Sequence, residues 1–329
     1  MRHFSVTINF INNGEWAYPT GHVIDEYIGF FAVSIFFMIS AYLFWGRCSN
    51  DGTNWIKVLI GRLFRIGPMF IVSSLMCWAV AYKFGLNKSF DTLAVKDVFH
   101  WFDLGLTNTK PDVFGFKYSY LINSGVMWTL PWEWMLYLSL PFFSLVANKK
   151  NSVSVVLAVL FIDFYFFKNI DKLSASLVAM FVMGALSYEI KKIVRFNFNE
   201  KVLSLASVLL FIVCAFVFKN GGQISLESSL LYACFFLTIC LGANPLGLLR
   251  INGAVRLGEI SFSLYLIHGI VWYVFGRVML KFDMAGHEFI YYFLASLAFL
   301  FSCFLSAFTY HFIEAKMISI GRKIQSAIF

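Results

Sequence analysis

The chain has 329 residues and a net charge of +8; 60% of its residues are hydrophobic and only 13% are charged. Soluble domains carry about 25% charged residues, because polar groups must cover their surface. The composition therefore excludes a soluble enzyme and a disordered tail. The long apolar runs exclude a transmembrane barrel, which shows short alternating strands. We expect an all-α fold, a polytopic transmembrane helical bundle in a lipid bilayer.

Ten apolar stretches follow one another, and most approach the roughly 20 residues that a helix needs to cross ~30 Å of hydrocarbon. The first is too short to cross alone. The connections are mostly short, so we expect a single membrane domain over residues 1–329. In the longest loop, about 83–125, apolar residues at helical spacing within Thr92–Leu106 predict a segment along the membrane interface. The predicted spans lie at about 1–12, 26–45, 67–82, 126–147, 152–167, 173–190, 202–218, 225–242, 257–276 and 289–312.

The basic residues predict the topology. When the loops are assigned alternately to two sides, one side receives fifteen Lys and Arg residues and the other ten, five of them in the 83–125 loop. Because cytoplasmic loops are enriched in Lys and Arg, we expect the 48–66 loop and both chain ends to be cytoplasmic. This topology accounts for the basic net charge, so we expect no nucleic-acid partner. The six cysteines lack metal-ligand spacing and a disulfide framework, so we expect no metal site.

Ionisable side chains within spans are costly in lipid and are therefore functional candidates. We interpret three glutamates at cytoplasmic span ends (Glu189, Glu259 and Glu314) as solvated by headgroups and neighbouring basic residues. For Asp163, we expect a buried hydrogen bond to a neighbouring helix. The complete set is His3, Glu133, Asp163, Glu189, Glu259, His268, His311 and Glu314.

Glu133 differs from the other carboxylates in its surroundings. It stands in MWTLPWEWMLYLSLP near the outer end of its span, with Trp128, Trp132 and Trp134 around it. Indole rings favour this depth, so part of the pattern is an aromatic belt. A carboxylate among three indoles is poorly solvated, and a histidine would be its natural partner in a pair that orients a general base. A structural hydrogen bond is the alternative, and the residues leave both open.

Arg62 and Arg65 form an R-x-x-R pair in KVLIGRLFRIGPMF, directly before the third span. Residues three apart lie on one face of a helix, so both guanidinium groups would point the same way. Such a pair at the cytoplasmic surface can hold phosphate groups bidentately. Ordinary basic flanking of a span is the alternative interpretation of the same residues.

Five segments together resemble a known family, in its order along the chain. They are VSIFFMISAYLF (33–44), GRLFRIGP (61–68), WTLPWEWMLYLSLP (128–141), LGEISFSLYLIH (257–268) and TYHFIEAKMISIG (309–321). On these segments the chain resembles the membrane-integral acyltransferase-3 family, the bacterial O-acyltransferases that modify O-antigen, capsule and other polysaccharides. The likeness covers nearly the whole chain.

The resemblance implies a reaction and roles for individual residues. The donor would be acetyl-CoA or a related acyl-CoA on the cytoplasmic side, with no permanently bound cofactor. The acceptor would be a hydroxyl of a surface glycan or its lipid-linked precursor, at the bacterial inner membrane. His3 matches the catalytic histidine of the family's first span, with Glu133 as its supporting carboxylate. Arg62 and Arg65 match the pair that holds the CoA phosphates, and we expect structural or pathway roles for Tyr265 and His268.

The sequence departs from the family pattern in several places. The family's first span carries a basic residue eleven positions before the histidine, so we expect the first span here to be truncated by half a helix. Ala41 stands where Gly is usual, Ser34 where Asp is common, and Lys316 replaces the closing Pro. Two other hypotheses stay open: a transporter or flippase for glycan precursors or small acids, and an inactive remnant.

Overall fold

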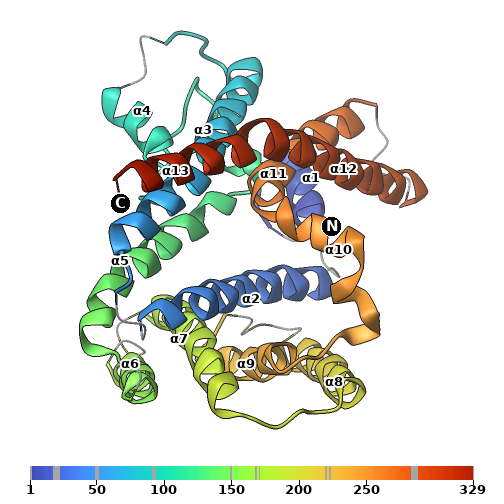
Figure 1. Cartoon of the computed structure of the whole chain (residues 1–329). Coiled ribbons are helices and arrows are strands. Elements are labelled where there is room, and N and C mark those ends of the chain that lie inside the picture. Colours follow the sequence, from blue (N-terminus) through green and yellow to red (C-terminus); the bar gives the residue numbers. More distant parts are fainter. Residues whose placement is uncertain are drawn as a thin grey trace. The chain divides into compact units, whose positions relative to one another are not determined.

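A computed structural model describes residues 2–17, 23–48, 52–90, 94–148, 150–166, 169, 171–218, 221, 224–282 and 288–328. Within these residues the regular elements are helices, and the only β-pairing is an isolated bridge between Val113 and Phe116. The expectation of an all-α membrane fold is therefore confirmed (Figure 1). The chain divides into two compact units, and the prediction of a single domain stays a prediction.

Every predicted span contains a helix, but the count of ten spans is not confirmed. Six helical stretches are long and apolar enough to cross a membrane, and the last of them runs continuously from Phe289 to Ile328. Four other helices are shorter than the roughly 20 residues that a crossing requires. They are α1 (Arg2–Asn13), α5 (Leu130–Val146), α6 (Ser152–Tyr165) and α9 (Leu226–Cys240).

The first unit comprises residues 1–20, 55–134 and 256–329. Within it, α11 packs against α1, α3, α12 and the short 3₁₀ helix η1. Gly269 of α11 lies so close to η1 that a Cβ atom there would overlap the backbone of Asn123. The elements of this unit are α1, α3 (Trp55–Phe84), α4 (Val95–Phe102), η1 (Ser119–Asn123), η2 (Val126–Thr129), the first turn of α5, α11 (Ser261–Lys281), α12 (Glu288–Thr309), the π-helical turn η5 (Tyr310–Glu314) and α13 (Ala315–Ile328).

The long loop of the first unit is a packed structure. Its helix α4 lies against α3, with Trp101 fully buried and its indole Nε1 donating to the carbonyl of Pro111 at 2.8 Å. The rings of Phe102 and Phe114 both contact Trp78 of α3. Other side chains of α4 remain exposed, so the expected position of this segment along a membrane interface stays a prediction.

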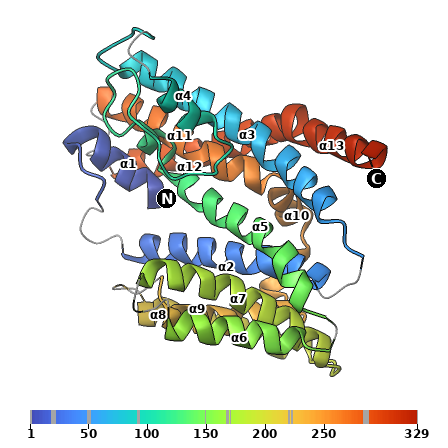
Figure 2. The ribbon, with the colours of Figure 1, turned by 90° about the vertical axis from the view of Figure 1, so that its left-hand side faces the viewer.

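The second unit comprises residues 21–54 and 135–255. Its principal packing is between α2 (Val23–Cys48) and α7 (Lys172–Ile193), which lie side by side in Figure 2. A Cβ atom at Gly184 of α7 would overlap the backbone of Met38 in α2, so glycine permits this close approach. The remaining elements are the rest of α5, α6, α8 (Glu200–Phe218), α9, and η4 (Pro245–Arg250), while α10 (Asn252–Glu259) joins the two units in sequence.

For three acidic residues, the structure differs from the surroundings that the sequence predicted. Glu189 is buried instead of solvated, accepting a hydrogen bond from Trp45 Nε1 at 2.9 Å and pairing with Lys192 Nζ at 3.5 Å. Glu314 is buried as well, whereas Glu259 is exposed as expected. Asp163 is buried, but among the described residues neither of its carboxylate oxygens has a hydrogen-bond partner.

Candidate active site

The four predicted site residues all belong to the first unit. His3 lies in the first turn of α1, and its side chain is outside the part of the chain that the structure describes. Arg62 and Arg65 lie three residues apart in α3, and both side chains are half-buried. Glu133 lies in the first turn of α5 and is only 3% exposed.

Arg65 is paired with a carboxylate that the sequence interpretation had assigned to the membrane surface. Its Nε atom lies 3.7 Å from Glu314 Oε1, and the other carboxylate oxygen accepts a hydrogen bond of 2.6 Å from Ser263 Oγ. Arg65 keeps 37% of its side chain exposed, whereas the Glu314 side chain is 1% exposed. Three segments distant in sequence therefore meet at one buried carboxylate.

The backbone at Glu314 explains its burial. Across η5 the continuous C-terminal helix contains a π-helical turn, which accommodates one extra residue. Buried positions before it are spaced three or four residues apart, but the next one, Glu314, comes five residues after Thr309. In a regular α-helix five residues rotate the side chain about 140° past a full turn, out of the buried stripe. The stripe consists of Ala295, Ala298, Ser302, Ser306, Thr309, Glu314 and Gly321.

Contacts beyond this turn hold the C-terminal helix against α3. Gly321 of α13 faces Phe64, leaving too little room for a Cβ atom, and Gln325 Nε2 donates to the backbone carbonyl of Lys57. Phe64 lies between Arg62 and Arg65 in sequence, and Lys57 lies five residues before Arg62. These contacts therefore hold the C-terminal helix along the part of α3 that carries the arginine pair.

The first turn of α5, which carries Glu133, is held by two neighbours. On one side, Trp134 Nε1 donates to the carbonyl of Leu104 at 2.9 Å. On the other side, the Tyr265 hydroxyl of α11 donates to the carbonyl of Val126 at 2.8 Å and lies 2.9 Å from the hydroxyl of Thr129. Tyr265 thus fixes η2, directly before α5, and the structural or pathway role expected for it stays a prediction.

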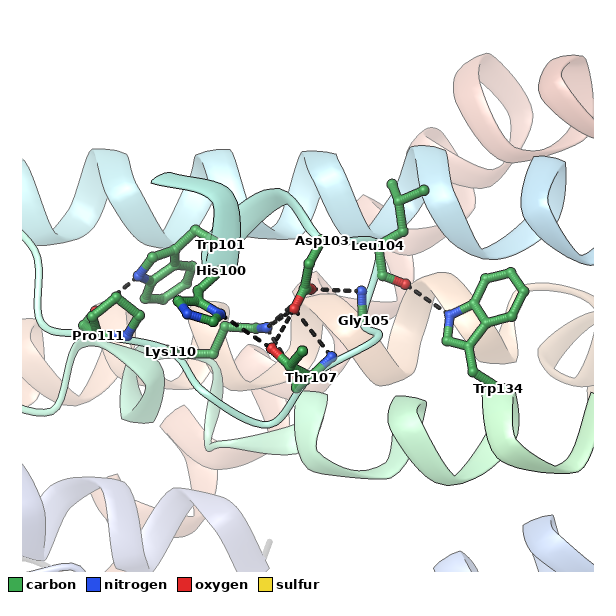
Figure 3. A network of polar contacts seen from close by, with 9 residues as sticks. All are labelled: His100, Trp101, Asp103, Leu104, Gly105, Thr107, Lys110, Pro111 and Trp134. Carbon is green, nitrogen blue, oxygen red and sulfur yellow. Dashed lines mark hydrogen bonds and ion pairs between the residues drawn. The ribbon is translucent and has the colours of Figure 1, made fainter. Parts of the chain in front are cut away.

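A buried ion pair orders the loop that receives Trp134 (Figure 3). Lys110 Nζ lies 3.1 and 3.2 Å from the two carboxylate oxygens of Asp103 and donates to the carbonyl of Thr107 at 2.9 Å. The same carboxylate accepts backbone N–H bonds from Gly105 and Thr107, each at 3.0 Å. Burial lowers the pKa of Lys110, and the Asp103 carboxylate opposes this shift. The sequence interpretation missed this pair, because nothing in a loop sequence marks two charges seven residues apart as buried partners.

The first turn of α1 lies near His268. The His268 ring contacts the Trp272 ring at a centroid distance of 5.5 Å, and Trp272 in turn contacts Phe4 at 5.9 Å. His268 Nδ1 lies 3.0 Å from the backbone carbonyl of Leu264. Because Phe4 follows His3, the backbone of His3 lies beside this part of α11. The pairing of His3 with Glu133 stays a prediction.

The first unit therefore contains the partly exposed guanidinium group of Arg65, which is paired with the buried carboxylate of Glu314. It also contains a second buried carboxylate, that of Glu133 in α5. In the described part of the chain, no three His, Cys, Asp or Glu side chains gather as a metal-binding group.

Comparison with known proteins places the chain in a family. A family model described as "Acyltransferase domain" matches residues 3–308. Neither the curated proteins nor the solved structures gave a match. The matched segment begins at His3 and includes Arg62, Arg65 and Glu133, and it covers most of the 329 residues. The chain is a multi-pass membrane protein that belongs to the acyltransferase-3 family.

Proposed function

We propose that this protein is a membrane O-acyltransferase that moves an acyl group, acetyl in the simplest case, from acyl-CoA to a hydroxyl of a surface polysaccharide or its lipid-linked precursor. The observation that carries this proposal is the family match over residues 3–308. The membrane would be the bacterial inner membrane, with both chain ends and the arginine pair on its cytoplasmic side, where acyl-CoA is available.

In the proposed reaction His3 acts as general base. It removes the proton of the acceptor hydroxyl while the oxygen attacks the thioester carbonyl carbon. The tetrahedral intermediate then collapses, the C–S bond breaks, and the CoA thiolate takes the proton back from His3. The products are the acyl ester of the glycan and CoA. Glu133 would orient the imidazole and stabilise its charged form.

Arg62 and Arg65 would hold the phosphate groups of the donor. A guanidinium group presents five N–H donors in a planar fork that matches phosphate oxygens. Arg65 supports this role because its side chain is partly exposed while a buried carboxylate restrains its Nε edge. A cation used only to flank a membrane span would need no such restraint.

Acetylation of a glycan in cells tests the proposal. We expect expression in a strain that makes a matching polysaccharide to add acetyl esters, visible by NMR of the purified glycan. His3→Ala and Arg65→Ala should abolish the signal. Glu200→Gln serves as control, because it removes an exposed ion pair with Arg250 in the second unit. Unchanged acetyl content in both site variants would refute the assigned roles.

The transporter hypothesis is separated by donor binding. An acyltransferase should bind labelled acetyl-CoA when purified, and an Arg62→Ala/Arg65→Ala double variant should lose that binding. A transporter of glycan precursors needs no such site, so wild-type protein that transports a glycan precursor without binding acetyl-CoA would favour that alternative.

A further inference from the structure

The carboxylate of Glu314 is held in one orientation by its surroundings. Its Oε2 accepts the hydrogen bond from Ser263, which lies in the first turn of α11. The first turn of a helix carries unpaired N–H groups and partial positive charge, which favour a carboxylate there. The other oxygen, Oε1, has no hydrogen bond among the described residues and faces Arg65 Nε at 3.7 Å. One oxygen is therefore anchored, and the other is directed at Arg65.

The geometry of Arg65 leaves its outer edge available. The closest approach in the ion pair is at Nε, and among the described residues neither terminal Nη nitrogen makes a hydrogen bond. A carboxylate at the Nε edge and an anion at the Nη edge can bind one guanidinium group together, because its five donors point outward in one plane. With 37% of its side chain exposed, Arg65 is not fully covered by the rest of the protein.

The burial of Glu314 costs free energy, because a buried carboxylate is poorly solvated. A regular α-helix would bury the neighbouring residue, Ile313, in its place. The π-helical turn at Tyr310–Glu314 puts the acidic residue there instead of the apolar one. Such turns are rare and occur frequently at functional sites. A helix that only had to pack against α3 would bury the isoleucine.

From this geometry we propose that Glu314 is a positioning residue for Arg65, which it holds by the Nε edge so that the two Nη nitrogens face a phosphate group of the acyl-CoA donor. The inference rests on the proposed function, because it assumes that Arg65 binds the donor. Ser263 extends the arrangement by fixing the carboxylate itself. Glu314 touches Arg65 and not the reacting atoms, so its effect is on donor binding.

The test compares Glu314→Gln with a matched control, Glu189→Gln, in purified protein reconstituted in lipid nanodiscs. Both positions are buried glutamates that accept a neutral hydrogen bond and pair with a half-exposed cation, but Glu189 belongs to the second unit. We expect Glu314→Gln to raise the KM for acetyl-CoA and the Kd for CoA about tenfold, the effect of one charge-assisted contact, with kcat nearly unchanged. Glu189→Gln should leave both constants at wild-type values, and both variants should unfold at similar temperatures.

Two further variants separate positioning from a general structural effect. Ser263→Ala keeps the charge of Glu314 but frees its orientation, so it should raise the KM in the same direction by a smaller factor. In an Arg65→Ala background, Glu314→Gln should add nothing to the loss of CoA binding, because its effect passes through Arg65.

Three outcomes would contradict the inference alone, and a fourth would contradict it together with the proposed function. Unchanged CoA affinity in Glu314→Gln, with affinity lost in Arg65→Ala, would show that Arg65 needs no positioning. Tighter CoA binding in Glu314→Gln would show that the carboxylate competes with the phosphate for Arg65. If Glu314→Gln weakened CoA binding further in the Arg65→Ala background, its effect would not act through Arg65. If Arg65→Ala itself binds CoA as wild type does, the role of Arg65 in the proposed function fails, and the inference fails with it.

Discussion

Replacement of Lys110 by methionine tests how the buried ion pair orders the long loop of the first unit. The Lys110 side chain is 3% exposed, and Nζ contacts both oxygens of Asp103 and the carbonyl of Thr107. It also lies 5.4 Å from the ring centroid of Phe70 in α3. Methionine keeps the length and the apolar stem of lysine but removes the charge and the three donors. The carboxylate of Asp103 is then buried without its cation.

The structure sets the expected magnitude. Removing one partner of a buried ion pair costs about 3–5 kcal/mol, because the remaining charge is uncompensated. Here Asp103 keeps three donors, the N–H groups of Gly105 and Thr107 and the Thr107 hydroxyl. The cost should therefore lie near the lower limit, about 3 kcal/mol, which corresponds to a roughly 150-fold change in a local opening equilibrium.

Hydrogen exchange reports this equilibrium directly, because the amides of Gly105 and Thr107 donate to Asp103. In Lys110→Met we expect their protection to fall by about two orders of magnitude. Lys117→Met, in the same loop but exposed, is the control. An Asp103→Asn/Lys110→Met double variant should be less perturbed than Lys110→Met alone, because it removes both charges.

Two results would refute this reasoning. Equal protection in Lys110→Met and Lys117→Met would mean that the ion pair does not order the loop. If the Asp103→Asn/Lys110→Met variant lost as much protection as Asp103→Asn and Lys110→Met together, Asp103 and Lys110 would act independently.

Two further predictions concern helix geometry. Deleting Ile313 should be tolerated, because one residue fewer turns the π-helical turn into an α-helical one and keeps the buried carboxylate on its face. Deleting Leu305 from the regular part of α12 should instead abolish the folded protein, as measured by size-exclusion chromatography, and equal yields would contradict this explanation. Asp171 caps α7, and its hydrogen bond with Ser174 lowers its pKa below the ordinary 3.8. The stabilisation of α7 by the Asp171 carboxylate is therefore fully present above pH 3.8. It is lost as the pH falls through the lowered pKa of Asp171. Wild type and Asp171→Ala should differ in amide hydrogen exchange at the first amides of α7 above pH 3.8, and this difference should vanish as Asp171 is protonated. A difference that persists at lower pH would contradict the capping role of the carboxylate.

Much of the fold was determined by local sequence signals. Apolar runs and low charge indicate membrane helices because the hydrocarbon core leaves the backbone no other way to satisfy its N–H and C=O groups than within each helix. Each predicted span accordingly contains a helix. The placement of Arg62 and Arg65 on one face of α3 is equally local, since it depends only on a spacing of three residues. The span count exceeded what the structure supports because α5, α6 and α9 are shorter than the apolar runs suggested, while α1 is as short as its run.

Tertiary structure alone decided which charges are buried and with what partners. Glu314 stands 51 residues from Ser263 and still further from Arg65, and a π-helical turn that periodicity does not reveal directs it inward. Asp103 and Lys110 lie in a loop, where no helical or strand period reports burial. The sequence by itself determined the class of protein, its helices and its family resemblance, because these follow from composition and short-range pattern. The pairing of carboxylates with cations depends on packing between distant segments, and only the folded chain brings them together.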